Sequence, residues 1–314
     1  ETNTLIREIC KKHKLNKHTG DYACKHCVEM WKSAISNHGL TNKFKIRKLL
    51  KNRTRKNLVI EPQSVNKTGD GFFTRVLGKM KSNLSLSLIT KNSVLQYNGV
   101  TKQYVIIVPQ DKNDIRKVCR ASKCGIDVGI RTFLTTFSDK ETLEIGTSDV
   151  TYPIMSKYFD RVDRLQEIKD KGIKIKNYSK VREKYYNKMK NKIDDLHCKA
   201  ASYLIRNYKE IIIGNVSTKR MVSNEGCLPK ITKRRVLTYS HYKFRMKLKT
   251  MATKFGNTIT EVTEYLTTKT CCNCGNIKDD LGQNKVYECN TCPIVLDRDV
   301  NAAINIYKNL KLSR

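Results

Sequence analysis

The sequence predicts a multidomain α/β protein, and three observations lead to that prediction. Short apolar stretches typical of strands come first, and helical and strand patterns then alternate, which is the order expected of a mixed α/β sheet. Two Cys-x-x-Cys motifs near the C-terminus mark off a small segment with a centre of its own. The length of 314 residues allows one large domain or two to three small ones, and 39% hydrophobic residues suffice for packed cores.

Residues 1–60 are predicted to be helical, because apolar side chains such as Tyr22, Trp31 and Leu40 fall at loosely helical spacings. Within them, residues 43–56 hold eight basic residues and no acidic one. Such a run is either a solvated helix face or a surface that a polyanion neutralises, and the lack of acids favours phosphate contact. We therefore predict that nucleic acid binds Lys43, Lys45, Arg47, Lys48, Lys51, Arg53, Arg55 and Lys56.

Strand patterns replace the helical ones after this run. Residues 57–61, 84–89 and 102–109 are rich in aliphatic and β-branched side chains, and residues 84–89 alternate Leu with Ser as a half-buried strand does. Glycines and a proline punctuate the three stretches. We expect a small β-barrel or β-sandwich module here.

A mixed sheet with covering helices is predicted from residue 124 onwards. Residues 124–137 predict a strand, a turn and a second strand, and residues 142–145 are a candidate third strand. Helical spacing over residues 157–208, interrupted at 172–177, predicts a helical hairpin. Further strands are expected at 211–213 and 258–265, with a basic helix at 233–254 between them and a last helix from Asp299.

The charge of the chain indicates a polyanionic partner. Subtracting 29 acidic from 62 basic residues gives a net charge of +33, for which nucleic acid is the simplest counterpart. No run of ~18 apolar residues exists, so we expect no membrane-spanning helix. The first 30 residues are too polar for a signal peptide, so we expect a protein that is not secreted. The chain opens with Glu1, which leaves open whether residues precede it.

The strongest motif is a pair of cysteine knuckles. Cys271-x-x-Cys274 is followed, after 14 residues, by Cys289-x-x-Cys292, and two such knuckles place four thiolates around one tetrahedral zinc. We predict one structural zinc in a ribbon, and we treat Cys272 as a bystander because it is out of phase with both knuckles.

A second cysteine group near the N-terminus is weaker. Cys24-x-x-Cys27 has potential partners in Cys10 and in His13, His18 and His26, but their spacing is irregular. A second zinc and reduced, partly buried thiols are both open, and the single knuckle favours the thiols.

Acidic residues are rare in this chain, so their positions are informative. Asp127 lies inside an apolar strand, where a carboxylate is costly unless it is paired, hydrogen-bonded or bound to a cation. Asp297 and Asp299 open the last helix, where they could instead act as N-cap and first-turn charge.

Three segments together resemble the transposon-encoded TnpB family of compact RNA-guided DNA nucleases, which are related to type V CRISPR effectors. They are Gly125-Ile-Asp-Val-Gly129, residues 267–275 and residues 297–306. The resemblance covers residues 70–314 well and the first 60 loosely. It implies an RNase H-like RuvC domain interrupted by a zinc ribbon and preceded by a wedge β-barrel and a helical recognition lobe. The implied bounds are 1–60 for part of the lobe, 61–120 for the barrel, 121–268 and 295–314 for RuvC, and 269–294 for the ribbon.

One departure from the family pattern is informative. Bacterial members carry a catalytic glutamate where this chain has Gly214, whereas Glu264 stands at the end of the next predicted strand. The Fanzor branch of eukaryotes and giant viruses is similar in this respect, so the sequence looks more like Fanzor. In an RNase H-like sheet Glu264 would stand two strand spacings, ~10 Å, from the Asp127 backbone. Glu261 and Glu225 are poorer candidates.

The resemblance implies two Mg²⁺ ions held by Asp127, Glu264 and Asp299 for phosphodiester hydrolysis. It also implies two partners, a guide RNA (omega RNA) and a target DNA duplex with an adjacent short motif. The implied assembly is a monomeric ribonucleoprotein, located in the nucleus of a eukaryotic host or otherwise in the cytoplasm. Gly214 keeps a second function open, a cleavage-deficient RNA-guided repressor or transposition accessory. A zinc-ribbon DNA-binding factor without RNA explains the charge but not Asp127. The guide sequence, the adjacent motif and the host are not encoded in these patterns.

Overall fold

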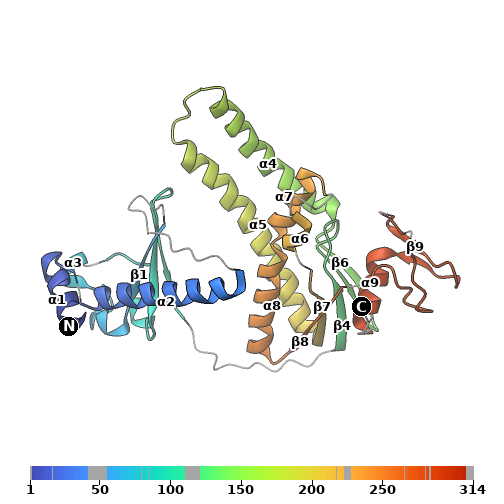
Figure 1. Ribbon diagram of the computed structural model, residues 1–314, viewed down its shortest axis with the longest axis horizontal. Coiled ribbons are helices and arrows are strands. Elements are labelled where there is room, and N and C mark those ends of the chain that lie inside the picture. The colour runs from blue at the N-terminus through green and yellow to red at the C-terminus, as the bar shows by residue number, and fades with distance from the viewer. Residues whose placement is uncertain are drawn as a thin grey trace. The chain divides into compact units, whose positions relative to one another are not determined.

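The computed structural model divides the chain into two compact units, Glu1–Asp111 and Lys112–Arg314 (Figure 1). It describes residues 2–308 except 16, 42–54, 79, 84, 110–120, 217, 223–227, 265, 280 and 283. Within the described residues, no helix combines the length and apolar character needed to cross a membrane.

The first unit joins helices to a small antiparallel sheet. Helices α1 (Thr2–Lys12) and α2 (Lys17–Thr41) confirm the helical prediction up to residue 41. Strands β1 (Arg55–Ile60), β2 (Ser93–Asn98) and β3 (Gln103–Ile107) pair antiparallel in that order. Short helices η1 (Pro62–Ser64), α3 (Thr74–Leu77) and η2 (Leu86–Leu88) pack beside them. The closure of a barrel stays a prediction.

The strand predicted at residues 84–89 is wrong. Residues Leu86–Leu88 form a 3-10 helix with Ile89 as its C-cap, and Leu86 and Ile89 are buried while Leu88 is half exposed. Side chains three residues apart eclipse one another in a 3-10 helix, so the same Leu/Ser alternation buries positions i and i+3 here. These two residues complete a core with Ile60 and Phe72.

The second unit is built on a five-stranded sheet in the order β6-β5-β4-β7-β8. The central strand β4 (Ala121–Asp127) pairs antiparallel with β5 (Leu134–Phe137), which pairs antiparallel with β6 (Thr142–Ile145). On its other side β4 pairs parallel with β7 (Tyr208–Gly214), and β7 with β8 (Thr258–Val262). The predicted strands are therefore confirmed, except that the strand predicted at 258–265 ends at Val262 and leaves Glu264 beyond it. Strands β4 and β7 end at the same edge.

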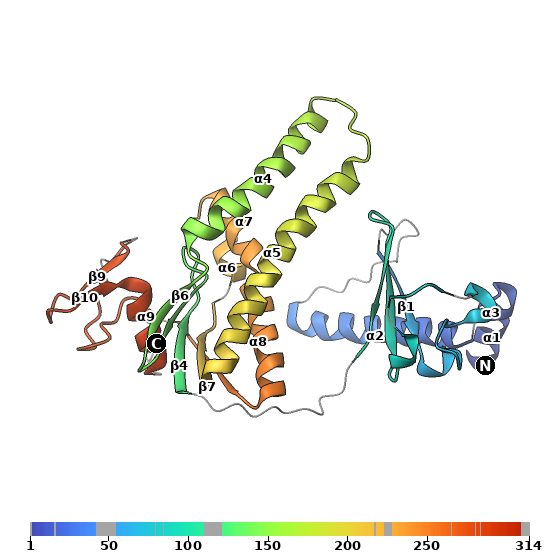
Figure 2. The same ribbon diagram turned by 180° about the vertical axis from the view of Figure 1, so that it is seen from behind.

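Helices cover both faces of this sheet (Figures 1 and 2). The predicted hairpin is confirmed as α4 (Ser148–Asp170) and α5 (Tyr178–Asn207). Helix α6 (Thr218–Val222) follows β7, and the helix predicted at 233–254 is two helices, α7 (Lys230–Tyr239) and α8 (His241–Phe255). Ser240 divides them because its φ of 51° is incompatible with a continuing right-handed helix.

The two faces of the sheet are covered by different elements. Apolar side chains of β4 and β7, including Cys124, Ile126, Ile211 and Ile213, pack in one core with residues of α5 and α8. Helix α9 (Arg298–Tyr307) lies on the opposite face, against β4 and β5. A small ribbon with strands β9 (Val286–Glu288) and β10 (Val295–Asp297) leads into α9.

Candidate functional site

Gly125 lets α9 lie directly on the central strand. A Cβ at this position would stand 2.5 Å from the backbone nitrogen of Tyr307 and 2.6 Å from the carbonyl oxygen of Ala303. Asp127 is two residues further along the same face of β4, and Asp299 is one helical turn before Ala303. The close packing thus brings the first turn of α9 towards the carboxyl end of β4, where Asp127 stands.

Asp127 is a buried carboxyl group whose side chain faces other acids. The residue is 6% exposed. Burial, and then the negative charges of Glu264 and Asp299, raise its pKa well above the usual range, while Arg298 opposes them. Burial and the neighbouring acids thus outweigh the nearby Arg298, and a bound cation would relieve the cost of ionising Asp127.

Glu264 reaches the same edge from beyond the end of β8. In the parallel ladder Gly214 pairs with Val262, and Asn215 donates its N–H to the Val262 carbonyl at 2.8 Å. A Cβ at Gly214 would stand only 1.9 Å from Oε1 of Glu264 and 2.6 Å from its Cδ. The Glu264 carboxylate therefore lies over Gly214, next to the end of the Asp127 strand.

The environment of Glu264 disfavours its charge in the absence of a cation. Its Oε1 is buried and accepts no hydrogen bond. Burial raises the pKa of Glu264 to about 7, although the Arg245 guanidinium opposes this. An orphaned, buried carboxylate oxygen on a side chain that interacts with Asp127 fits a hard divalent cation, which prefers oxygen ligands.

The two acids at the start of α9 have different tasks. Asp297 is the N-cap, and its Oδ1 accepts the N–H groups of Asp299 at 2.8 Å and Val300 at 3.4 Å. Asp299 is left free of this capping role, and burial followed by the charge of Asp297 raises its pKa. The predicted N-cap role of Asp297 is confirmed, and the role of Asp299 as a metal ligand stays a prediction.

The rejected glutamates differ from Glu264. Glu261 lies on the face of the sheet that α8 covers. Its Oε1 is 2.9 Å from Lys249 Nζ and 3.6 Å from Arg245 Nε. A carboxylate with two cationic partners is already neutralised, so Glu261 offers little to a metal. Glu225 lies outside the described residues.

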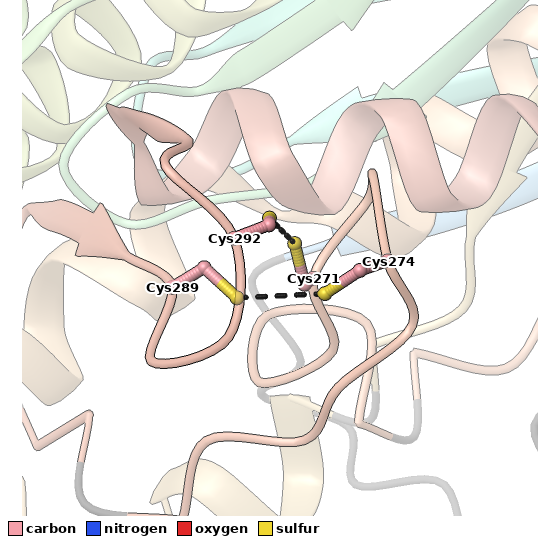
Figure 3. A group of neighbouring side chains, drawn as sticks. All are labelled: Cys271, Cys274, Cys289 and Cys292. Atoms are coloured by element: carbon pink, nitrogen blue, oxygen red, sulfur yellow. Dashed lines mark hydrogen bonds between the residues drawn. The ribbon is translucent and has the colours of Figure 1, made fainter.

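The four predicted zinc ligands converge in the ribbon (Figure 3). The Sγ atoms of Cys271, Cys274, Cys289 and Cys292 all lie within 4.8 Å of one another. Sγ of Cys271 is 3.6 Å from that of Cys292, and Sγ of Cys274 is 3.5 Å from that of Cys289. Disulfide sulfurs are ~2.05 Å apart, whereas two thiolates on one tetrahedral zinc stand ~3.8 Å apart. The geometry fits a zinc centre.

The ribbon backbone favours the thiolate form of Cys289. The N–H groups of Thr291 and Cys292 point towards the Cys289 sulfur and lower its pKa to about 6. Zinc binds thiolates rather than thiols, so a lowered pKa assists binding at neutral pH. At Cys274 the Asn276 backbone hydrogen bond lowers the pKa, but desolvation and the neighbouring thiols outweigh it and raise the pKa to about 12. The core under the centre is small, because only Cys271, Leu281 and Tyr287 of its members are fully buried.

In the described part of the chain, no other group of three or more ligating side chains lies within 4.8 Å of one another. The carboxylates of Asp127, Glu264 and Asp299 are therefore more widely spread than the cysteines. Three acids around a pair of ions ~4 Å apart need not touch one another.

Two buried asparagines, which the sequence analysis did not single out, connect the acids to the ribbon. Asn305 donates to the carbonyls of Thr267 at 2.8 Å and Thr270 at 2.7 Å. Asn301 donates to the Thr270 carbonyl at 2.7 Å and accepts the Cys272 N–H at 2.9 Å. Thr267 in turn donates its hydroxyl to the Glu264 carbonyl at 3.1 Å. The segment between Glu264 and the ribbon is thus fastened to the helix that carries Asp299. The Asn-Ala-Ala-Ile-Asn spacing, i and i+4 on one helix face, was the available signal.

Other predicted sites are not brought together. Cys24 and Cys27 are exposed on α2, and they form no ligand cluster with the buried Cys10 among the described residues. The predicted nucleic-acid residues Lys43, Lys45, Arg47, Lys48, Lys51 and Arg53 lie outside the described residues. Arg55 and Lys56 begin strand β1.

Comparison with protein families matches two parts of the chain. Residues 104–225 match a family model described as a probable transposase, and residues 241–306 match the Cas12f1-like TNB domain. Two TnpB-like proteins of Acanthamoeba polyphaga mimivirus are each 36% identical over 301 residues, which is 93% of this chain. The chain covers 57% and 56% of these two relatives, so it spans just over half of their length. A TnpB-like protein of Methanocaldococcus jannaschii is 28% identical over 191 residues, covering 53% of this chain and 67% of its own.

Solved structures similar to this chain include two effector complexes. The Cas12f1–sgRNA–target DNA complex is 19% identical, with a TM-score of 0.43, and the match covers 84% of this chain and 69% of that one. The CRISPR-Cas12f ternary complex is 22% identical, with a TM-score of 0.44, covering 71% and 46%.

Proposed function

The chain belongs to the family of TnpB-like proteins, and from this premise we propose that it is an RNA-guided DNA endonuclease. One observation carries the proposal: Asp127, Glu264 and Asp299, from three separate segments, converge at one edge of the sheet beside a four-cysteine centre. Buried acids whose pKa values stay raised despite nearby arginines weaken a fold, so their convergence is best explained by catalysis.

Asp127, Glu264 and Asp299 would hold two Mg²⁺ ions in this proposal. When bound, such ions activate a water molecule and stabilise the leaving oxygen of a phosphodiester. The unpartnered Oε1 of Glu264 and the raised pKa values of all three carboxyl groups support this assignment. Cys271, Cys274, Cys289 and Cys292 would hold one structural zinc.

The residues of the chain have distinct tasks around this centre. Asp127 is held rigidly by the central strand, and the Gly125 contact sets the distance between that strand and α9. Asp297 fixes the first turn of α9 through its cap, so that the Asp299 side chain is free to bind. Asn301 and Asn305 fasten the segment that follows Glu264 to α9, which fixes the position of Glu264 relative to Asp299.

The domain identity is part of the proposal. We infer an RNase H-like RuvC domain from the strand order β6-β5-β4-β7-β8 with its antiparallel and parallel halves, and a wedge module and part of a recognition lobe in the first unit. Gly214 with Glu264 supports the Fanzor branch. The partners would be a guide RNA and a duplex target with an adjacent motif, in a monomeric ribonucleoprotein located in the nucleus if the host is a eukaryote and otherwise in the cytoplasm.

The alternative, a binding protein without cleavage, depended on Gly214. Because the Glu264 carboxylate fills the place of a side chain at 214, the missing glutamate no longer argues for a dead nuclease. The observed geometry favours the nuclease.

The test is cleavage by the purified ribonucleoprotein. The RNA that copurifies is sequenced, and a duplex complementary to its guide segment is offered with randomised flanking sequence and Mg²⁺. We expect cleavage that requires both RNA and Mg²⁺. Specific binding of the target without any cleavage would establish the binding protein instead, and the absence of copurifying RNA would contradict an RNA-guided function.

A further inference from the structure

A tight turn joins strand β4, which ends with Asp127, to strand β5. Asp127 pairs with Thr135 across the two strands, so the chain reverses its direction between these residues. Gly129 allows the tight reversal, because a Cβ at this position would stand 2.4 Å from the carbonyl oxygen of Thr132. The Gly129 N–H donates to the Phe133 carbonyl at 3.4 Å, which closes the turn. The tip of the turn is therefore fixed in position relative to Asp127.

The turn is also fastened to the rest of the second unit. The Tyr152 hydroxyl of α4 donates to the Ile130 carbonyl at 2.9 Å. The Tyr152 ring is itself covered by the Arg235 guanidinium, which lies 3.7 Å from the ring centre. At the end of the turn, the Phe133 side chain is fully buried in the core. A turn held at both sides keeps its shape when a ligand binds, so it suits a group that must be positioned accurately.

The turn borders the acidic face of the sheet. Asp127 pairs with Thr135, and Thr135 pairs with Glu144 on β6, so these three residues lie in one row on the same face. The Thr132 hydroxyl, in the turn, donates to Glu144 Oε1 at 3.4 Å. Because the Gly125 contact places α9 on this face, the β4–β5 turn and the first turn of α9 lie beside the same site.

Arg131 is presented at the tip of this turn. It is the only exposed residue in the run 123–138, all of which the structure describes. Burial and the charge of Asp297 raise the pKa of Asp299, whereas the charges of Arg298 and Arg131 oppose them. The turn geometry and this electrostatic interaction together put the Arg131 side chain at the rim of the acidic site, on the side of Asp299.

An arginine at this rim works against the metal ions of the proposed function. Like charges repel, so a fixed cation beside a metal-binding carboxylate lowers the affinity of the site for Mg²⁺. The arrangement becomes favourable when an anion lies between the arginine and the ions. A phosphodiester is such an anion, and its oxygens gain negative charge as it is attacked, so the attraction is greatest in the transition state.

The guanidinium group has the shape that this contact needs. It is planar, presents paired N–H donors that match two phosphate oxygens at once, and stays charged throughout the pH range of the protein. A lysine at the same place would supply the charge as a single point without the fork.

We propose that Arg131 is a catalytic residue that donates hydrogen bonds to a non-bridging oxygen of the scissile phosphodiester in the acidic site. The inference rests on the proposed function for the presence of that phosphodiester. Arg131 contacts the reacting group and not the length of the DNA, so its contribution appears in the rate of cleavage and not in the affinity for the target.

The test changes Arg131 to Gln, which removes the charge, and to Lys, which keeps the charge without the fork. Arg164→Gln is the matched control, because Arg164 is also exposed but lies on α4, far along the chain from the turn. The guide-loaded protein is compared in its cleavage rate at saturating target, its target affinity, its Mg²⁺ affinity without DNA, and its affinity for a thymidine dinucleotide in Mg²⁺. The dinucleotide carries a single phosphodiester and reports binding even in the absence of cleavage.

We expect Arg131→Gln to lower the cleavage rate about 100- to 1,000-fold, the usual loss when one donor to a developing negative charge is removed. The dinucleotide affinity should fall about 10-fold or more. Arg131→Lys should lie between the wild type and Arg131→Gln in both quantities. The target affinity should not change, and the Mg²⁺ affinity without DNA should stay equal or rise, because a repelling charge has been removed.

The Mg²⁺ measurement separates this role from a structural one. If Arg131 instead held Asp299 in place, Arg131→Gln would lower the Mg²⁺ affinity together with the melting temperature, and that result would overturn the inference. A dinucleotide affinity equal to that of Arg164→Gln would also overturn it, whether or not the wild type cleaves. A wild type that binds the dinucleotide through Arg131 but never cleaves its target would contradict the proposed function and still support the contact of Arg131 with the phosphodiester.

Discussion

The Glu264 carboxylate stands where a side chain at Gly214 would begin, with Oε1 1.9 Å from an ideal Cβ. The two positions therefore cannot both carry a side chain in this arrangement. Gly214 is paired in the parallel ladder with Val262, two residues before Glu264, so the chain passes from β8 directly back over the end of β7. The carboxylate is supplied from one strand further away, and a glycine on the intervening strand makes room for it.

The first prediction concerns the charge of Glu264. Glu264→Gln keeps the size of the side chain but removes the charge that would hold metal, so cleavage should fall at least 100-fold, about 3 kcal/mol of lost stabilisation. Target binding should be unchanged, because the site is buried and small. The rate at saturating target and Mg²⁺ is the measurement. Glu261→Gln is the matched control, since Glu261 is paired with Lys249 and Arg245. Full activity of Glu264→Gln would contradict the assignment.

The second prediction concerns the space at Gly214. Gly214→Ala should displace the Glu264 carboxylate, because no Cβ is tolerated 1.9 Å from an oxygen. We expect a large loss of cleavage with zinc content and guide binding retained. The double variant Gly214→Glu with Glu264→Ala should recover part of the activity, since it moves the carboxylate to the adjacent strand. Wild-type cleavage by Gly214→Ala would show that the overlap is relieved at no cost.

Sequence patterns predicted the parts of this site that have strict spacing or unusual cost. Two Cys-x-x-Cys motifs specify one centre whatever the fold around them, and a carboxylate amid Gly-Ile-Val residues of a strand indicates a ligand. The alternation of Leu and Ser at residues 84–89 suits a strand, but Leu86 begins a 3-10 helix and Ile89 caps it. The break at Ser240 depends on a positive φ that serine rarely adopts, so the helical pattern did not reveal it. Gly125 and Asn305 act through contacts with distant segments, so only the fold reveals them.

A third prediction follows from the raised pKa of Glu264. Its pKa is raised from 4.5 to about 7, so between these values the folded state binds more protons than the unfolded state, and the free energy of unfolding falls as pH rises. Above pH ~7 the metal-free protein loses on the order of 3 kcal/mol relative to acid pH from this group. Glu264→Gln, which mimics the protonated form, should remove that dependence and be more stable than the wild type at pH 8.

Mg²⁺ provides the second half of this test. Because Mg²⁺ binds the ionised carboxylate, its stabilisation of the wild type should grow as pH rises through 7, and it should be much weaker in Glu264→Gln. The measurement is denaturant unfolding at pH 5 to 8, with and without Mg²⁺. Parallel pH profiles for the two proteins would contradict the raised pKa.

A fourth prediction concerns zinc. We expect one zinc per chain, and removal by a chelator should unfold the ribbon, whose fully buried core is only Cys271, Leu281 and Tyr287. Cys292→Ser should reduce zinc to well under one per chain and expose the amides of β9 and β10 to hydrogen exchange. Cys272→Ser is the control, because Cys272 contributes its backbone N–H to Asn301 and is not among the four clustered sulfurs. Equal zinc contents in the two variants would refute the four-cysteine centre.

The last prediction concerns Asn305 as a positioning residue. Its amide donates to the carbonyls of Thr267 and Thr270, and Thr267 holds the Glu264 backbone. Asn305→Asp is nearly isosteric but turns a double donor into an acceptor that faces two carbonyls. Each lost hydrogen bond with a buried partner costs about 1–3 kcal/mol. The damage should appear first in the segment that carries Glu264, rather than in the zinc centre, whose ligands are held by their own knuckles.

We therefore expect Asn305→Asp to lower the cleavage rate and the Mg²⁺ affinity, while zinc content and target affinity stay near those of the wild type. Asn305→Ser has a shorter side chain but keeps a donor, so its cleavage rate and Mg²⁺ affinity should lie between those of the wild type and of Asn305→Asp. Hydrogen exchange should increase in residues 264–270 and not in β4. Loss of zinc together with target binding would instead show that Asn305 stabilises the whole unit and does not position Glu264 in particular.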